Sequence, residues 1–161
     1  MNQTHVHLLI NHLPVFGSIL GALVLGYGLW TRSYQTKIAS YYLFIISTLG
    51  AVIAYLTGEA AEESVENIQG VSKDLIEQHE EFAVFALVAL IILGVASLIG
   101  LFITIRKSAL TRIVATVILF ISLISFGLIA RTAYVGGLIR HTEINANQTT
   151  QTQGGEKEKD D

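Results

Sequence analysis

The sequence has no cysteine, a single proline and few charged residues. Without cysteine, disulfides, thiolate zinc sites, cysteine-bound iron–sulfur clusters and cysteine nucleophiles are all excluded. Any metal site must therefore use nitrogen and oxygen ligands. Charged residues make up 14% of the chain and hydrophobic residues 52%, whereas a soluble domain has about 25% charged residues. The shortage of charge is concentrated in four long apolar runs, which indicates an integral membrane protein in contact with the lipid bilayer.

The chain also lacks the patterns of most soluble functions. Its net charge is -3 and no basic stripe is present to neutralise phosphates, so we expect no nucleic-acid partner. There is no phosphate-binding loop, no zincin motif and no nucleophile–base pair at a recognisable spacing. We therefore expect an electron carrier or a subunit of a membrane complex rather than a stand-alone enzyme. Residues 1–7 contain no Lys or Arg, so we interpret the first apolar run as a retained helix and not as a signal peptide.

The four apolar runs cover about residues 8–30, 38–57, 82–105 and 113–135. Each has about the 20 residues that cross a hydrocarbon core, and within lipid such segments must be helices. Allowing for polar extensions, we expect helices at about 8–31, 37–68, 72–106 and 109–138. The predicted fold class is all-α, a four-helix transmembrane bundle formed by residues 1–144. We expect the polar, low-complexity segment 145–161 to be a disordered tail.

Charge is distributed unevenly over the connections between these runs. The two short connections carry five basic residues and no acidic one: Arg32, Lys37, Arg106, Lys107 and Arg112. Acidic residues gather instead in the long connection that begins near Glu59. The positive-inside rule then places the short connections in the cytoplasm and both termini on the outer, periplasmic side. All five histidines fall on this outer side.

Three histidines stand at the start of the first run, one starts the third and one follows the fourth. His5 and His12 are seven residues apart and share a helix face, whereas His7 and Asn11 share another. Pro14 either lies in the first turn of the membrane-embedded helix or kinks a longer one. Imidazole is the commonest metal-ligating side chain. Hydrogen bonding to lipid headgroups is the alternative interpretation for these interfacial histidines.

Further candidates lie on the third and fourth helices. Ala83 and Ala86 follow His79 at helical spacing, and such small residues favour either close helix packing or a slot for a flat macrocycle below an axial histidine. Gly17 and Gly21 form a GxxxG pattern that predicts a close helix contact. Arg131 lies in the last turns of the fourth helix, and Arg140 and His141 follow that helix. The arginines are candidates for binding carboxylates or propionates, with snorkelling to headgroups as the alternative.

The segment His7-x4-His12-Leu13-Pro14 and the later His79 resemble an uncharacterised bacterial family of small four-helix membrane proteins. Members open with a His-x4-His-hydrophobic-Pro signature and carry another histidine at the start of the third helix. Some are joined to Rieske iron–sulfur domains. The resemblance covers about residues 5–144 and implies membrane electron transfer with b-type haem, in the bacterial cytoplasmic membrane. This chain differs in having Leu8 where many members have a proline.

Three functional hypotheses follow. The first is a haem b electron-transfer protein with His12 and His79 as the preferred axial pair. His7 and His141 are the next candidates, Arg131 or Arg140 would hold propionates, and the redox partner would be a protein or a quinone. The second is a divalent metal-binding protein that holds Zn or Cu with His7, His12, His79, His141 and Glu63. The third is a cofactor-free structural subunit of a respiratory membrane complex, and the protein is also a candidate homo-oligomer.

Overall fold

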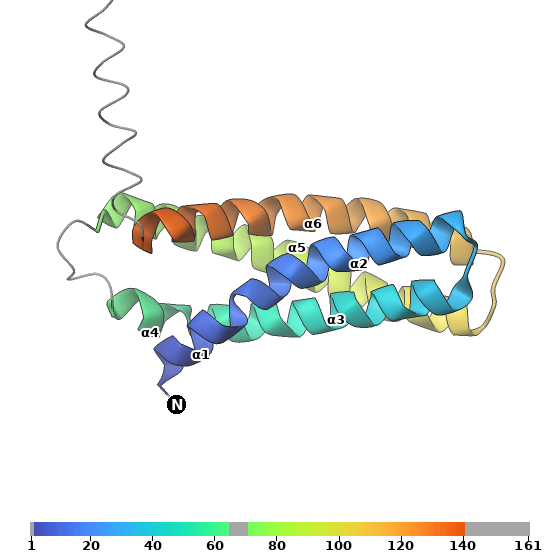
Figure 1. Ribbon diagram of the computed structural model, residues 1–161, viewed down its shortest axis with the longest axis horizontal. Coiled ribbons are helices and arrows are strands. Elements are labelled where there is room, and N and C mark those ends of the chain that lie inside the picture. Colours follow the sequence, from blue (N-terminus) through green and yellow to red (C-terminus); the bar gives the residue numbers. More distant parts are fainter. Residues whose placement is uncertain (1, 65–70, 141–161) are drawn as a thin grey trace, which may run out of the picture.

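A computed structural model describes residues 2–64 and 71–140 of the chain. Within these residues every regular element is a helix, and the long helices form an antiparallel four-helix bundle (Figure 1), as predicted. Four helical segments are long and apolar enough to cross a membrane, and the first of them consists of two consecutive helices. The helices are α1 (Gln3–Ile10), α2 (His12–Trp30), α3 (Tyr34–Leu56), α4 (Gly58–Glu63), α5 (Lys73–Ile105) and α6 (Thr111–Arg140).

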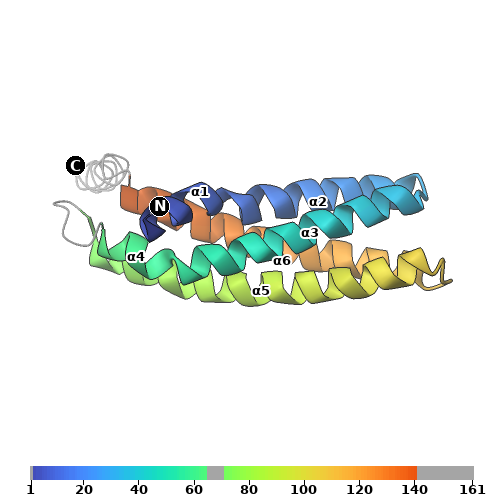
Figure 2. The same ribbon diagram turned by 90° about the horizontal axis from the view of Figure 1, so that it is seen from below.

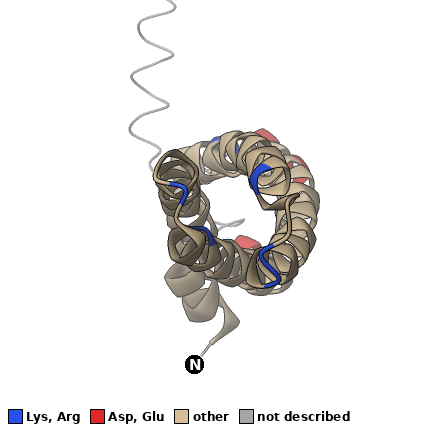
Figure 3. Cartoon of the chain, turned by 90° about the vertical axis from the view of Figure 1, so that its right-hand side faces the viewer, with Lys and Arg blue, Asp and Glu red and all other residues tan. Residues whose placement is uncertain are grey.

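The bundle has two chemically different ends. We call one the histidine end, because α1, the start of α5 and the end of α6 meet there beside α4 (Figures 1 and 2). The other is the basic end, formed by the α2–α3 and α5–α6 connections with their Lys and Arg residues (Figure 3). The chain therefore starts α1 and finishes α6 at the same end of the bundle. Which end faces outward stays a prediction from the charge pattern.

The first membrane segment is divided at Asn11, between α1 and α2. Pro14 causes this break, because it has no N–H to donate to the carbonyl of Ile10 and its ring crowds that carbonyl. Pro14 lies in the first turn of α2, as one of the two sequence-based interpretations expected. The break lets α1 lean toward α3 and α4, where the Thr4 hydroxyl donates to the carbonyl of Ala60 at 2.9 Å.

The second predicted helix, about 37–68, is shorter than expected. α3 ends at Leu56, and the separate short helix α4 follows from Gly58. Thr57 interrupts the helix with φ -105° and ψ 0°, and its hydroxyl donates to the carbonyl of Ile53 at 2.8 Å. Such local side-chain bonds compete with the regular ladder. Residues 65–68 of the prediction lie outside the described residues.

The other two predicted helices agree more closely with the structure. α5 starts after Ser72, whose extended backbone has the geometry of an N-cap, and it ends one residue before the predicted boundary. α6 continues through Gly136 and Gly137 to Arg140, beyond the predicted end at about 138. The predicted tail, 145–161, lies outside the described residues.

Small residues let the helices approach closely inside the bundle. A Cβ added to Gly21 would lie 2.5 Å from Cε1 of Phe44, and one added to Gly17 would lie 2.8 Å from Cβ of Ser47. The GxxxG pattern is therefore the contact surface of α2 on α3, as predicted. The Ser47 hydroxyl also donates to the carbonyl of Pro14 at 3.0 Å, joining the two helices by a buried hydrogen bond.

Large apolar side chains cover much of the outside of the bundle. Trp30 is 82% exposed, and Phe16, Leu23, Phe102 and Phe120 also point outward. Exposing this surface to water would be unfavourable. A soluble monomer rarely exposes a contiguous apolar patch of more than a few hundred Å². The arrangement is that of a protein in contact with membrane lipid.

Candidate functional site: a histidine pair at one end of the bundle

His7 connects the first helix to the end of the third. Its Nδ1 lies 2.8 Å from the carbonyl oxygen of Ala54 on α3. That carbonyl belongs to the last turn before the Thr57 break, where helix carbonyls have no main-chain partner within the helix, and the Thr57 hydroxyl lies 3.2 Å from it. A carbonyl can only accept, so Nδ1 of His7 carries the proton. The Thr57 hydroxyl, 3.5 Å from Nδ1, already donates to Ile53 and so lies there as a second acceptor.

His79 connects the fifth helix to the sixth in a similar way. Its Nδ1 lies 3.0 Å from the carbonyl oxygen of Thr132 on α6 and therefore donates to it. The ring can reach this carbonyl because Gly136, one turn further along α6, has no side chain. A Cβ at Gly136 would lie 2.8 Å from Cε1 of His79 and 3.0 Å from its Nδ1.

The two imidazoles are thus held in the same tautomer. With Nδ1–H bound to a main-chain carbonyl, each neutral ring keeps its lone pair on Nε2. Among the described residues, neither Nε2 has a hydrogen-bond partner. Both rings lie at the histidine end of the bundle, His7 against α3 and His79 against α6. The structure therefore brings together two half-buried imidazoles from different pairs of helices, each with an available ligand nitrogen.

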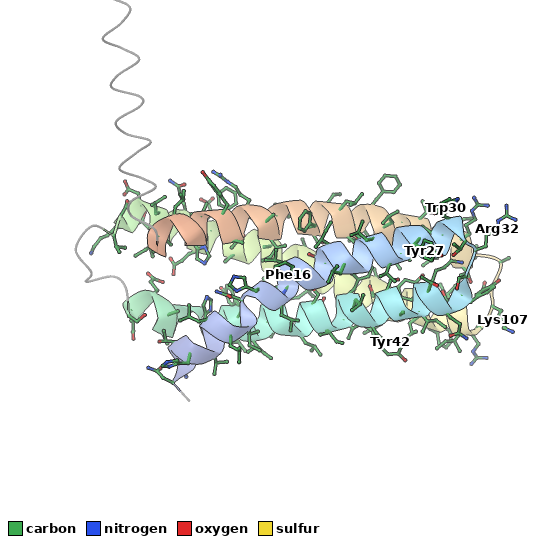
Figure 4. The ribbon with its side chains drawn as sticks, in the orientation of Figure 1. Phe16, Tyr27, Trp30, Arg32, Tyr42 and Lys107 are labelled. Atoms are coloured by element: carbon green, nitrogen blue, oxygen red, sulfur yellow. The ribbon has the colours of Figure 1, made fainter. Side chains whose placement is uncertain are left out.

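His12 and His5 occupy the other face of the first segment. Both are exposed, and His12 stacks on Phe16 with 6.4 Å between ring centroids; Phe16 lies on the outer surface of α2 (Figure 4). His7 and Asn11 are partly buried, so the predicted division of these four residues into two faces is confirmed. The structure therefore turns His7, and not His12, toward the bundle at the end where His79 lies.

The remaining predicted site residues are only partly described. Arg131 is exposed at the histidine end, where its guanidinium lies 5.2 Å from the ring centroid of Phe82 and 5.6 Å from that of Tyr134. These contacts hold the cation on aromatic faces. Arg140 ends α6, and the structure does not describe its side chain. His141 lies outside the described residues.

Apolar side chains are buried near the two histidines. Ala51 and Ala86 are buried in the same core cluster, and Ala54 supplies the carbonyl that binds His7. Deeper in the bundle, Leu90 is fully buried. Ile76, Val135 and Leu138 are also buried at the histidine end, so the bundle interior there is apolar but is not lined by small side chains alone.

One polar atom on the face of His7 bears on what the site can bind. The side-chain oxygen of Asn11 is buried and has no hydrogen-bond partner within the described residues. Asn11 shares the face of His7, one helical turn away. A buried amide without a partner is unusual, and it marks this face as one that can accommodate a further polar group.

The described residues do not form a compact site for a bare metal ion. Within 2–64 and 71–140, no group of three or more histidine or carboxylate side chains is arranged to hold one. Glu63 is exposed on α4 and His12 points outward. Zinc sites normally use three or four protein ligands, whereas haem needs only one or two axial ligands. Comparisons with models of protein families, with curated proteins and with solved structures found no match.

Sequence reasoning missed the groups that hold the histidines. The carbonyls of Ala54 and Thr132 are main-chain atoms, and every residue has one, so no residue type indicates them. Gly136 was a detectable signal, because a glycine inside an apolar membrane helix marks a close approach of another group. The Gly136-Gly137 pair stands out in the sequence, but His79 as its neighbour follows only from the packing of α5 on α6.

Proposed function

We propose that this protein is a membrane electron carrier that binds a b-type haem with His7 and His79 as axial ligands. The supporting observation is the pair itself: two imidazoles on different helices, each with Nδ1–H bound to a main-chain carbonyl and Nε2 available. Haem-ligating histidines need this arrangement, because the bond from Nδ1 sets the tautomer, orients the ring and increases the basicity of the ligating nitrogen.

The residues around the pair fit a flat, largely apolar cofactor. The side chains buried near the histidine end, such as Ala86, Ile76 and Val135, are apolar, and the two ligands come from different helix pairs. When bound, haem would supply one-electron chemistry, and the protein would set its potential through the axial ligands and the exclusion of water. Arg131 is the described cation closest in sequence to Thr132 and would bind a propionate, exchanging an aromatic contact for an ion pair.

The role of the chain in this proposal is to hold and orient. Ala54 and Thr132 keep both rings from rotating, and Gly136 provides the space that His79 occupies. The histidine end would face the periplasm, following the positive-inside rule, and would exchange electrons with a quinone or with a redox protein. A bare Zn or Cu ion is the less favoured ligand, because the described residues offer it two histidines and no third donor.

An absorption spectrum of the protein, purified from haem-replete cells without a histidine tag, tests the proposal. We expect a Soret band and reducible α and β bands. His7→Ala and His79→Ala should each remove the spectrum of a six-coordinate low-spin haem, and added imidazole should restore it. His12→Ala and His5→Ala are the matched controls and should leave the spectrum unchanged.

Two results would contradict the proposal. A colourless protein with stoichiometric zinc or copper by elemental analysis would favour the metal-binding hypothesis. A colourless, metal-free protein that co-purifies with stoichiometric partners would favour a structural subunit. If His12→Ala rather than His7→Ala removed the spectrum, the proposed ligand pair would be wrong even though haem binds.

A further inference from the structure

The first and fourth helices stand apart from the rest of the bundle. α1 and α4 lie side by side and pack on each other and on α3, but neither packs substantially on α5 or α6 (Figures 1 and 2). Neither of these two helices contains a buried residue. Segments with few buried apolar contacts open at a low cost in free energy. We call this pair of helices, Gln3–Ile10 and Gly58–Glu63, the flap.

Each helix of the flap joins the bundle through an interruption of the helical backbone. Asn11 separates α1 from α2, and Thr57 separates α3 from α4. The Thr57 hydroxyl lies 3.5 Å from Nδ1 of His7, which precedes Asn11 by one turn. The two interruptions therefore lie about one turn apart along the bundle. Two hinges at nearly the same depth allow the flap to turn as a unit.

The hydrogen bonds of the flap differ in what they connect. The Thr4 hydroxyl donates to the carbonyl of Ala60 at 2.9 Å, and both residues belong to the flap. The bond of 2.8 Å from Nδ1 of His7 to the Ala54 carbonyl instead crosses from the flap to α3. A rotation at the two hinges would keep the first bond and break the second. His7 is therefore placed as a latch between the flap and the bundle.

Asn11 has an unused hydrogen-bonding atom that a rotated hinge would employ. Its side-chain oxygen is buried and has no partner within the described residues. An N-cap residue normally has an extended backbone, and its side chain accepts from an N–H two or three positions along. Asn11 precedes α2 but has φ -58° and ψ -23°, and it makes no such bond. With an extended ψ at Asn11, α1 would leave its present direction and the oxygen would accept from the N–H of Leu13, since Pro14 has none.

We propose that α1 and α4 form a hinged flap with two positions. In the closed position His7 holds the flap on the Ala54 carbonyl. In the open position this bond is broken and Asn11 caps α2, so each position satisfies a polar group that the other leaves with fewer partners, and both are populated. His7 travels with the flap whereas His79 stays on α5, so opening would separate the two ligands and admit a flat cofactor. This last consequence rests on the proposed function.

Distances between spin labels in the full chain, reconstituted in lipid nanodiscs, test the flap. The chain has no cysteine, so labels attach only to cysteines that are introduced. Gln3→Cys with Glu77→Cys joins the flap to α5, where the neighbouring Ile76 is buried. We expect one major distance and a second, minor one. Gln3→Cys with Glu59→Cys lies within the flap and should give a single narrow distance, which also excludes fraying of α1.

Two sets of variants test the latch and the cap. His7→Phe keeps a ring but removes the donor, and should increase the share of the second distance roughly two- to tenfold, as the loss of one hydrogen bond implies. His5→Phe, on the exposed face of the same helix, is the matched control and should change nothing. In the His7→Phe chain, adding Asn11→Ala should lower that share about fivefold because alanine is a poor N-cap, whereas adding Asn11→Ser should retain it.

Three results would overturn the proposal. Equal effects of His7→Phe and His5→Phe, or no effect of either, would show that His7 is not a latch. Equal shares with Asn11→Ala and Asn11→Ser would show that the cap does not form. A split distance between the labels at Gln3 and Glu59 would show that α1 and α4 move separately. The distances report the flap whether or not haem binds, so failure of the haem proposal would not change their interpretation.

Discussion

Replacing Gly136 by alanine should displace His79 from its carbonyl partner. The new Cβ would lie 2.8 Å from Cε1 of His79, whereas ordinary van der Waals contact begins near 3.4 Å, so the two groups must separate by 0.6 Å or more. The imidazole is also anchored 3.0 Å from the Thr132 carbonyl. Moving the ring outward lengthens this hydrogen bond, so the substitution acts on both packing and ring orientation.

The adjacent Gly137 gives a matched control for this change. A Cβ at Gly137 would meet nothing within 4 Å. Both substitutions remove a glycine from α6, and each should gain about 0.5–1 kcal/mol from helix propensity. That gain cancels in the comparison. The remaining difference is the cost of overpacking at Gly136, about 1–3 kcal/mol, which includes the weakened hydrogen bond from His79.

Thermal unfolding in detergent measures this difference. A change of 1 kcal/mol shifts Tm by roughly 2–4 °C for a chain of this length. We therefore expect Gly136→Ala to melt several degrees below Gly137→Ala. Two-dimensional NMR of the histidine ring nitrogens should show a perturbed Nδ1–H of His79 in Gly136→Ala alone. If the protein binds haem as proposed, only Gly136→Ala should broaden or shift its Soret band.

Equal melting temperatures for the two variants, with unchanged ring signals, would refute this reasoning. Such a result would mean that α5 and α6 separate freely at the histidine end. The Thr132 carbonyl would then not determine the orientation of His79, and the argument for its tautomer would no longer hold.

Two further predictions concern the contact between α2 and α3. Gly21→Ala would place a Cβ 2.5 Å from Cε1 of Phe44 and should lower Tm, whereas Gly26→Ala, which meets no atom within 4 Å, should leave Tm unchanged or raise it. A thermal scan of both variants in one detergent decides the matter, and equal values would contradict the close packing. Ser47→Ala removes the 3.0 Å bond to the Pro14 carbonyl and should cost about 0.6 kcal/mol, the average for such bonds in membrane helices. Chemical unfolding in mixed micelles measures this cost, and a stabilised variant would count against the bond.

The helical part of the fold follows largely from the sequence. Long apolar runs predict helices because lipid offers no partner for main-chain polar groups. The same runs place the basic connections at one end and the histidines at the other. The break at Thr57 did not follow from hydropathy, because residues 59–63 are glutamates and alanines with good helix propensity that can extend a helix beyond the membrane. Gly58, which follows the break, is a poor helix former and is the signal in the sequence for a helix end at this position.

Helical periodicity was a better guide to the site than depth in the membrane. The spacing separates His5 and His12 from His7 and Asn11, and the structure confirms this division. The proximity of His12 to Pro14 favoured it as the partner of His79, but that argument concerned depth and not direction. Which of the two faces turns inward depends on how α1 rests on α3 and α4, and this packing follows from tertiary contacts that the sequence does not show.

The two histidines reach their carbonyls by opposite means, and this explains why one end of the bundle can hold such a pair. At His7 the helix ends: the Thr57 break leaves the Ala54 carbonyl without a main-chain donor, with only the Thr57 hydroxyl 3.2 Å away, and the imidazole donates to it. At His79 the helix continues, and Gly136 exposes a carbonyl that any other residue there would cover. Restoring a continuous helix at Thr57 should therefore release only the ring of His7. Replacing Gly136 by a larger residue should release only the ring of His79. A site that needs both imidazoles would fail in either variant, whereas two independent histidines would each lose only their own hydrogen bond.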